Sequence, residues 1–242
     1  MTALLTVTDV HAGYLPGVDI LQGLSIAARA NEITLVIGPN GAGKSTLLRT
    51  VFAFLAPNRG SITFRERATA GLRPSDLKAA GISYVTQDIN SFPGLTVDEN
   101  LRMGAWVFRR DRARLQRQLD RAFATFPALA GKRHARAGEL SGGQGRMLSV
   151  AREMMTEPQL LLVDEPTAGL APNLVEQVYE ILLTAKQSSG VAILLVEQNV
   201  EQALPLADHL YLLNLGRVKA EGPGREFDNA RVRTLIQECL LG

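Results

Sequence analysis

The stretch Gly38-Pro-Asn-Gly-Ala-Gly-Lys-Ser-Thr46 decides the fold of this 242-residue chain. It satisfies the pattern G-x-x-x-x-G-K-[ST] in full. The apolar run Ile33–Ile37 stops directly before it, as a strand buried on both faces does. A helix is predicted to follow from Lys44 to about Phe54. Strand, glycine-rich turn and helix in this order predict a phosphate-binding loop.

Each part of this loop has a chemical role toward a triphosphate. The glycines let backbone N–H groups approach phosphate oxygens, and the helix directs its positive end at them. Lys44 supplies a charge for the β- and γ-phosphate oxygens, and the Ser45 hydroxyl is a ligand for Mg²⁺. We therefore expect ATP and Mg²⁺ to bind at Gly38, Pro39, Asn40, Gly41, Ala42, Gly43, Lys44, Ser45 and Thr46.

Two carboxylates follow another apolar run, Leu160–Val163. Asp164 at the strand tip is placed to hold Mg²⁺, directly or through water. Glu165 is then free to orient or deprotonate the attacking water. A strand followed by Asp-Glu is usually a polar turn, but the phosphate loop upstream favours the catalytic interpretation.

The rest of the chain predicts an α/β fold, a P-loop NTPase core with a parallel sheet, because short apolar strands alternate with helical patterns such as Asn173–Lys186. Leu4–Ile26 indicates an N-terminal antiparallel β subdomain that turns around Tyr14–Gly17. Three successive helices are expected between Val97 and Met155. We therefore predict a single domain over residues 1–242, in which the core (1–96 and 156–242) carries an inserted helical subdomain (97–155).

Bulk composition excludes several classes of function. The net charge of +2 predicts no nucleic-acid partner. Cys239 is the only cysteine, so an internal disulfide is impossible. The chain begins without a signal-peptide pattern, and no apolar run approaches the ~20 residues that span a bilayer. Any membrane contact is therefore expected to come through a partner.

A third motif, Leu140-Ser-Gly-Gly-Gln144, resembles the signature of the ABC transporter ATPases, and the resemblance covers almost the whole chain. It implies that two subunits pack head to tail, so that the signature of one closes on the γ-phosphate held by the other. The resemblance also implies that Tyr14 stacks on adenine and that Gln87 reaches the metal. The alternative for Tyr14 is an ordinary hairpin aromatic. The implied signature contacts are Ser141, Gly142, Gly143 and Gln144.

Within that family, Phe92–Gly104, Asp164–Pro172 and Leu195–Asn199 are similar to the LivF-type ATPase of branched-chain amino acid importers. Related amide and urea importers share much of this sequence. The resemblance implies a second ATPase subunit (an identical copy or a LivG-like chain), integral membrane permease subunits, a substrate-binding protein and a peripheral position on the cytoplasmic face of the membrane.

Four residues depart from the usual pattern of the family or the subtype. Gln198 stands where most members carry a catalytic histidine, and Ala171 stands where an aspartate is common. Both changes occur in the LivF type, and an amide can still hydrogen-bond a γ-phosphate. Gly145 and Arg146 follow the signature where glutamines are usual, and the glycine is expected to loosen the helix predicted over Arg146–Met155.

The arginine-rich stretch Phe108–Arg121 has two interpretations. One is a solvated helix face with Leu115, Leu119 and Ala122 turned inward. The other is contact with the permease or with anionic headgroups.

Two further functions remain alternatives to a transport ATPase. A soluble ABC ATPase of cofactor assembly has a similar length. A non-hydrolysing regulator is disfavoured by Lys44, Asp164 and Glu165.

Overall fold

The computed structural model describes residues 3–88 and 90–241, so residues 1, 2, 89 and 242 of the predicted 1–242 domain lie outside the described part. The strands are β1 (Ala3–Ala12), β2 (Leu21–Arg29), β3 (Ile33–Ile37), β4 (Arg59–Phe64), β5 (Arg67–Ala68), β6 (Ile82–Val85), β7 (Leu160–Asp164), β8 (Ala192–Val196), β9 (His209–Asn214) and β10 (Arg217–Pro223). The helices are α1 (Lys44–Val51), α2 (Pro74–Ala80), α3 (Val97–Gly104), α4 (Arg112–Thr125), α5 (Pro127–Ala130), α6 (Gly142–Met154), α7 (Pro172–Ser189), α8 (Val200–Ala203) and α9 (Asn229–Leu241).

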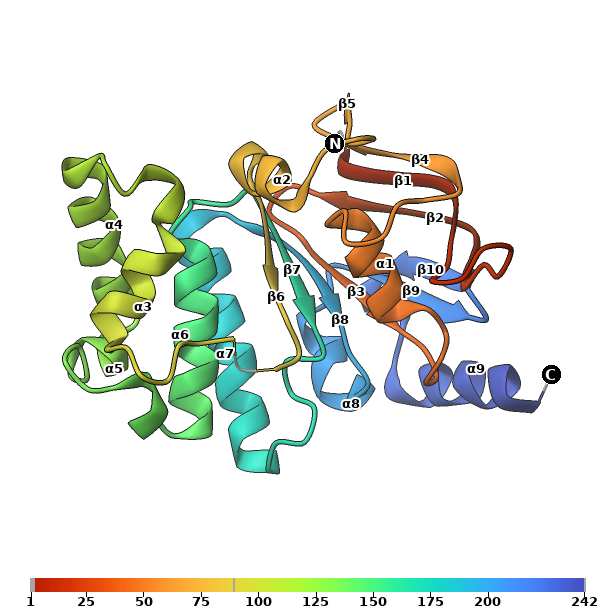
Figure 1. Ribbon diagram of the computed structural model, residues 1–242. Coiled ribbons are helices and arrows are strands. Elements are labelled where there is room, and N and C mark those ends of the chain that lie inside the picture. The colour runs from red at the N-terminus through yellow and green to blue at the C-terminus, as the bar shows by residue number, and fades with distance from the viewer. Residues whose placement is uncertain (1–2, 89, 242) are drawn as a thin grey trace.

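A six-stranded sheet in the order β10-β9-β3-β8-β7-β6 forms the centre of the molecule (Figure 1). The strands from β9 to β6 are parallel, which confirms the predicted parallel sheet, and β10 adds an antiparallel edge. Because β3, β7 and β8 are parallel neighbours, their carboxyl ends meet at one edge. The phosphate loop begins directly after β3, Asp164 ends β7, Glu165 follows it, and Gln198 lies two residues after the end of β8.

A second sheet, β2-β1-β4-β5, is antiparallel and contains the predicted N-terminal hairpin. Helix α1 packs between the two sheets, where Leu47 and Leu48 join a buried cluster with Val10 of β1 and Val36 of β3. Side chains on the opposite face of the six-stranded sheet, such as Ile193, join a second cluster with the helices. The strand before the phosphate loop is therefore held by buried contacts on both faces.

The region from Val97 to Met155 is helical, and Figure 1 shows it as a group of helices at one side of the sheet. The three predicted helices correspond to α3, α4 and α6, and the structure adds the short α5 and the 3₁₀ turns Trp106–Phe108 and Ala137–Glu139. In α4, Leu119 and Ala122 are buried as expected, while Arg114 pairs with Glu157 at 3.1 Å. No helix within the described residues is long and apolar enough to cross a membrane.

Two predicted helix boundaries were wrong for physical reasons. Helix α6 begins at Gly142 rather than Arg146, because Ser141 caps its first turn. Gly145 therefore lies inside the helix, where it donates its N–H to the Ser141 carbonyl at 2.8 Å. Helix α1 ends at Val51 rather than near Phe54, because Ala53 adopts a φ of 57° that a helix cannot continue through.

Candidate functional site

The phosphate loop wraps around the amine of Lys44. The Nζ atom donates to the Gly38 carbonyl at 2.9 Å and to the Pro39 carbonyl at 3.3 Å, and the residue is only 4% exposed. Gly38 has a φ of 150°, and a Cβ there would lie 2.3 Å from the backbone oxygen of Leu213 in β9. Only glycine therefore fits where the loop leaves β3. The result is a buried cation at the N-terminus of α1, a combination that binds anions.

Asp164 lies beside this loop at the end of β7, and two donors hold its carboxylate. Ser45 donates to Oδ1 at 2.9 Å, and the Tyr84 hydroxyl of β6 donates to Oδ2 at 2.8 Å. Burial raises the pKa of Asp164, and these two hydrogen bonds oppose that increase. Burial, together with the Asp164 charge, also raises the pKa of Tyr84, which stays a hydrogen-bond donor at physiological pH.

The oxygens of Ser45 and Asp164 fit a small, hard divalent cation. Mg²⁺ is held by one or two carboxylate or hydroxyl oxygens and takes its remaining ligands from water and phosphate. Ser45 and Asp164 offer such a set beside a phosphate loop, and their hydrogen-bond contact places both oxygens together. Gln87 lines the same cleft, so its amide oxygen is a further candidate ligand.

Glu165 links the phosphate loop to Gln198, which lies two residues after the end of β8. Its Oε1 lies 3.6 Å from Lys44 Nζ, and its Oε2 accepts from Gln198 Nε2 at 2.7 Å. The backbone of Glu165 has a φ of 41°, an uncommon conformation for a non-glycine residue, and its N–H donates to the Val196 carbonyl at 2.9 Å. Such backbone strain is common where a side chain is held for chemistry. Carboxylate and amide are thus held together at the edge of the sheet.

The phosphate loop, Gln87, Glu165 and Gln198 surround an open cleft of about 460 Å³. Nine of the predicted site residues line this cleft, whereas Gly38, Pro39, Ala42 and Asp164 are not among its lining residues. Tyr14 does not line the cleft; it is 50% exposed, and its hydroxyl accepts from Arg49 at 3.0 Å. The residues that line the cleft are Ile20, Asn40, Gly41, Gly43, Lys44, Ser45, Thr46, Gln87, Glu165 and Gln198.

The predicted signature residues lie outside this cleft. Ser141 and Gln144 form a capping box: the Ser141 Oγ accepts from the Gln144 N–H at 3.3 Å, and the Ser141 N–H donates to the Gln144 Oε1 at 3.2 Å. Ser141 and Gly142 are exposed, and Gly143 is buried against α7. The helix N-terminus of α6 is therefore open to solvent in the single chain.

Three residues of the site were missed by the sequence analysis. Tyr84 and Ile20 carry no local signal, because only the fold brings them to Asp164 and to the cleft. Glu197 follows the apolar run of β8, a signal that was available. It is 1% exposed and accepts from Thr167 Oγ1 at 2.7 Å and from the Gln198 N–H at 3.0 Å, and burial raises its pKa. It fixes the backbone that carries Gln198.

Comparison with known proteins gives a consistent result. The family model described as "ABC transporter" matches residues 21–168. The branched-chain amino acid transport ATP-binding protein BraG of Pseudomonas aeruginosa is 39% identical and covers 93% of this chain and 96% of its own length. A probable LivF protein of Archaeoglobus fulgidus is 36% identical (92% and 93% covered), and a phosphonates import ATP-binding protein of Bordetella parapertussis is 32% identical (97% of both).

Comparison with solved structures points to the same family as the sequence comparison. The ADP conformation of an ATP-binding cassette of an ABC transporter is 29% identical, covers both chains completely and superposes with a TM-score of 0.85. This match extends over the strands, the phosphate loop and the helical region alike. The chain belongs to the ABC transporter family and is an ATP-binding, ATP-hydrolysing transport subunit.

Proposed function

We propose that this subunit hydrolyses ATP to drive import of branched-chain amino acids. The observation that carries the proposal is the similarity to BraG, which extends over almost the full length of both chains. Phosphonate-import relatives also match, but at 32% identity against 39% for BraG. The transported substrate contacts other subunits in such systems, so the assignment concerns the system in which this chain works.

The geometry of the cleft supports a specific division of labour. Lys44 neutralises charge on the β- and γ-phosphates of ATP, since its buried amine already faces the loop carbonyls. Glu165 orients and deprotonates the attacking water, and the Gln198 amide holds that carboxylate at 2.7 Å. Ser45, Asp164 and Gln87 would hold Mg²⁺, which supplies charge neutralisation between the phosphates when bound.

The cleft of a single chain is open to solvent, and the exposed N-terminus of α6 is suited to bind a γ-phosphate. We propose that Ser141, Gly142, Gly143 and Gln144 contact the nucleotide held by a partner ATPase, either an identical copy or a LivG-like chain. A Glu165→Gln variant with ATP and Mg²⁺ should form a dimer in light scattering. The double variant Glu165→Gln/Ser141→Arg should stay monomeric. Dimer formation by the double variant would refute this arrangement.

Coupling of this chain to a membrane permease can be tested by measuring amino acid uptake in cells. Expression of this chain in bacteria that lack their own LivF-type ATPase should restore leucine uptake, and Lys44→Ala should not. Co-expression with the permease genes of its own organism controls for subunit mismatch. Restored phosphonate uptake without leucine uptake would overturn the assignment of the system.

The arginine-rich helix offers a second, smaller test. Arg114 is already engaged with Glu157, whereas Arg110 and Arg117 are exposed. Replacing Arg110 and Arg117 with glutamate should weaken co-purification with the permease if this face docks on it. Unchanged assembly would leave the helix as a solvated surface.

A further inference from the structure

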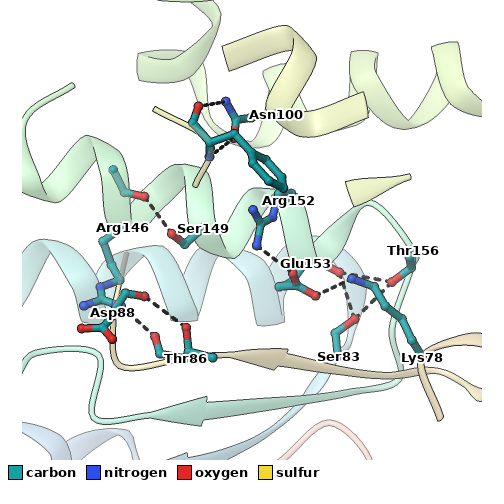
Figure 2. A network of polar contacts seen from close by, with 12 residues as sticks. Lys78, Ser83, Thr86, Asp88, Asn100, Arg146, Ser149, Arg152, Glu153 and Thr156 are labelled. Atoms are coloured by element: carbon teal, nitrogen blue, oxygen red, sulfur yellow. Dashed lines mark hydrogen bonds and ion pairs between the residues drawn. The ribbon is translucent and has the colours of Figure 1, made fainter. Parts of the chain in front are cut away.

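Arg146 reaches out of helix α6 to the segment that carries Gln87 (Figure 2). Its two terminal nitrogens donate to backbone oxygens: Nη1 to the Thr86 carbonyl at 3.0 Å and Nη2 to the Gln87 carbonyl at 2.6 Å. Thr86 continues the interaction, since its hydroxyl donates to the Asp88 carbonyl at 3.2 Å. A helix of the signature region is thereby joined to a loop of the nucleotide cleft.

The two acceptors are the carbonyls on either side of Gln87. The Thr86 carbonyl belongs to the peptide group before Gln87, and the Gln87 carbonyl belongs to the peptide group after it. Holding both peptide planes restricts φ and ψ of Gln87, because these are the two soft dihedrals between planar peptide groups. Arg146 therefore restrains the backbone that carries the Gln87 side chain, which lines the nucleotide cleft.

The contact is made by a buried guanidinium. Arg146 is 3% exposed, and its Nε has no hydrogen-bond partner among the described residues. Burial lowers its pKa, and the charges of Asp88 and Glu197 oppose this decrease. A buried donor without a partner destabilises the fold, so Arg146 is poorly suited to a purely structural role. Its fork of two parallel donors matches two adjacent carbonyls, a geometry that an amide or ammonium does not reproduce.

We propose that Arg146 is a positioning residue that fixes Gln87 relative to the signature helix. The same helix begins at the Ser141 cap, so movement of α6 is transmitted to the Gln87 carbonyls through one side chain. This role of Arg146 rests on the proposed function, in which the signature helix and the nucleotide cleft act together. It also gives a role to a residue that departs from the usual sequence of the subtype.

The test separates metal-dependent from metal-independent nucleotide binding. ATP affinity is measured by calorimetry for wild type and for Arg146→Met, once with Mg²⁺ and once with EDTA. Loss of the charge-assisted contact should weaken Mg-ATP binding by about tenfold. Binding of ATP in EDTA should stay within about twofold of wild type, because the phosphate loop is untouched. A general defect of folding would weaken both equally.

Two further variants keep the test decisive. Arg146→Lys keeps a charge but reaches one carbonyl, so its Mg-ATP affinity should fall between those of wild type and Arg146→Met. Arg152→Met removes another buried arginine of α6, one that contacts Glu153 at 3.4 Å, and should leave the ratio of the two affinities unchanged. Hydrogen exchange without nucleotide should accelerate in the Thr86–Asp88 peptide of Arg146→Met but not of Arg152→Met.

Equal affinities of wild type and Arg146→Met for Mg-ATP, or equal losses with and without Mg²⁺, would overturn the inference. If Arg146→Met does not fold, the Arg146→Lys variant decides by the same ratio. If wild type itself binds no ATP in either buffer, the proposed function fails, and this inference fails with it.

Discussion

Replacing Asp164 with asparagine should make the chain more stable and at the same time reduce its stabilisation by Mg-ATP. The carboxylate is 3% exposed, and burial raises its pKa above the ordinary value. Ionised Asp164 therefore destabilises the fold at neutral pH. Asparagine keeps the local hydrogen bonds: its Oδ1 accepts from Ser45, and its Nδ2 donates to the Tyr84 oxygen, which can turn its own hydrogen away.

The sign follows from linkage, because a group whose pKa is higher in the folded state than in the unfolded state destabilises the fold when it is ionised. We expect Asp164→Asn to raise the free energy of unfolding at neutral pH by an amount within the usual range of single substitutions, about 0.5–3 kcal/mol. Each kcal/mol shifts Tm by about 2–4 °C in a chain of this size. The gain should shrink as pH falls toward the pKa of folded Asp164, because the wild-type carboxyl then takes up a proton.

The assay is urea unfolding between pH 5 and 8, with and without Mg-ATP. Asp208→Asn is the matched control, because its carboxylate accepts from Lys186 at 2.7 Å and from the Ile33 N–H at 2.7 Å. That substitution should destabilise. Mg-ATP should stabilise wild type and the control more than it stabilises Asp164→Asn, which keeps the phosphate loop but loses a metal ligand. An Asp164→Asn protein that is less stable than wild type at pH 7 would refute the reasoning.

Three other substitutions test separate parts of the site. Gly38→Ala should destabilise by about 2–4 kcal/mol in thermal melts, because its Cβ would lie 2.3 Å from the Leu213 oxygen; an unchanged Tm would contradict the loop geometry. Gln198→Leu should lower kcat by up to about a hundredfold with little change in KM, since it releases Glu165; a pure KM effect would contradict this role. Ser141→Ala should cost about 1 kcal/mol of stability by loss of the cap. It should leave ATP binding to the single chain unchanged, because the signature lies outside the cleft.

Local patterns predicted the parts of the site that are contiguous in sequence. The phosphate loop, the strand before it and the acidic pair at the end of β7 were all recognisable, because strand, turn and helix signals coincide there. Gln198 and Glu165 are 33 residues apart, yet both follow apolar strands, so a parallel sheet brings them to one edge. Here the sequence rules and the tertiary arrangement agree.

Long-range pairing explains what was missed. Strand β9 was not predicted, although it lies next to β3 in the sheet and pairs His209 with Thr34. The Tyr84–Asp164 hydrogen bond joins residues that are 80 positions apart in the sequence, so no local sequence pattern predicts it. From sequence alone, Arg146 was only a departure from the glutamine that is usual in the subtype, next to a glycine expected to loosen the helix. The capping box starts α6 earlier than expected, and this places Arg146 against the Gln87 segment.

The most direct test of the account is Mg-dependent ATP hydrolysis by wild type and by Glu165→Gln, across a range of protein concentrations and with the partner ATPase added. We predict that wild-type hydrolysis per chain rises with concentration, because in the proposed dimer the signature of a second subunit completes each site. Glu165→Gln should lose at least about a hundredfold in rate while it still binds ATP. Hydrolysis by Glu165→Gln at the wild-type rate would contradict the assignment of Glu165 as the catalytic carboxylate.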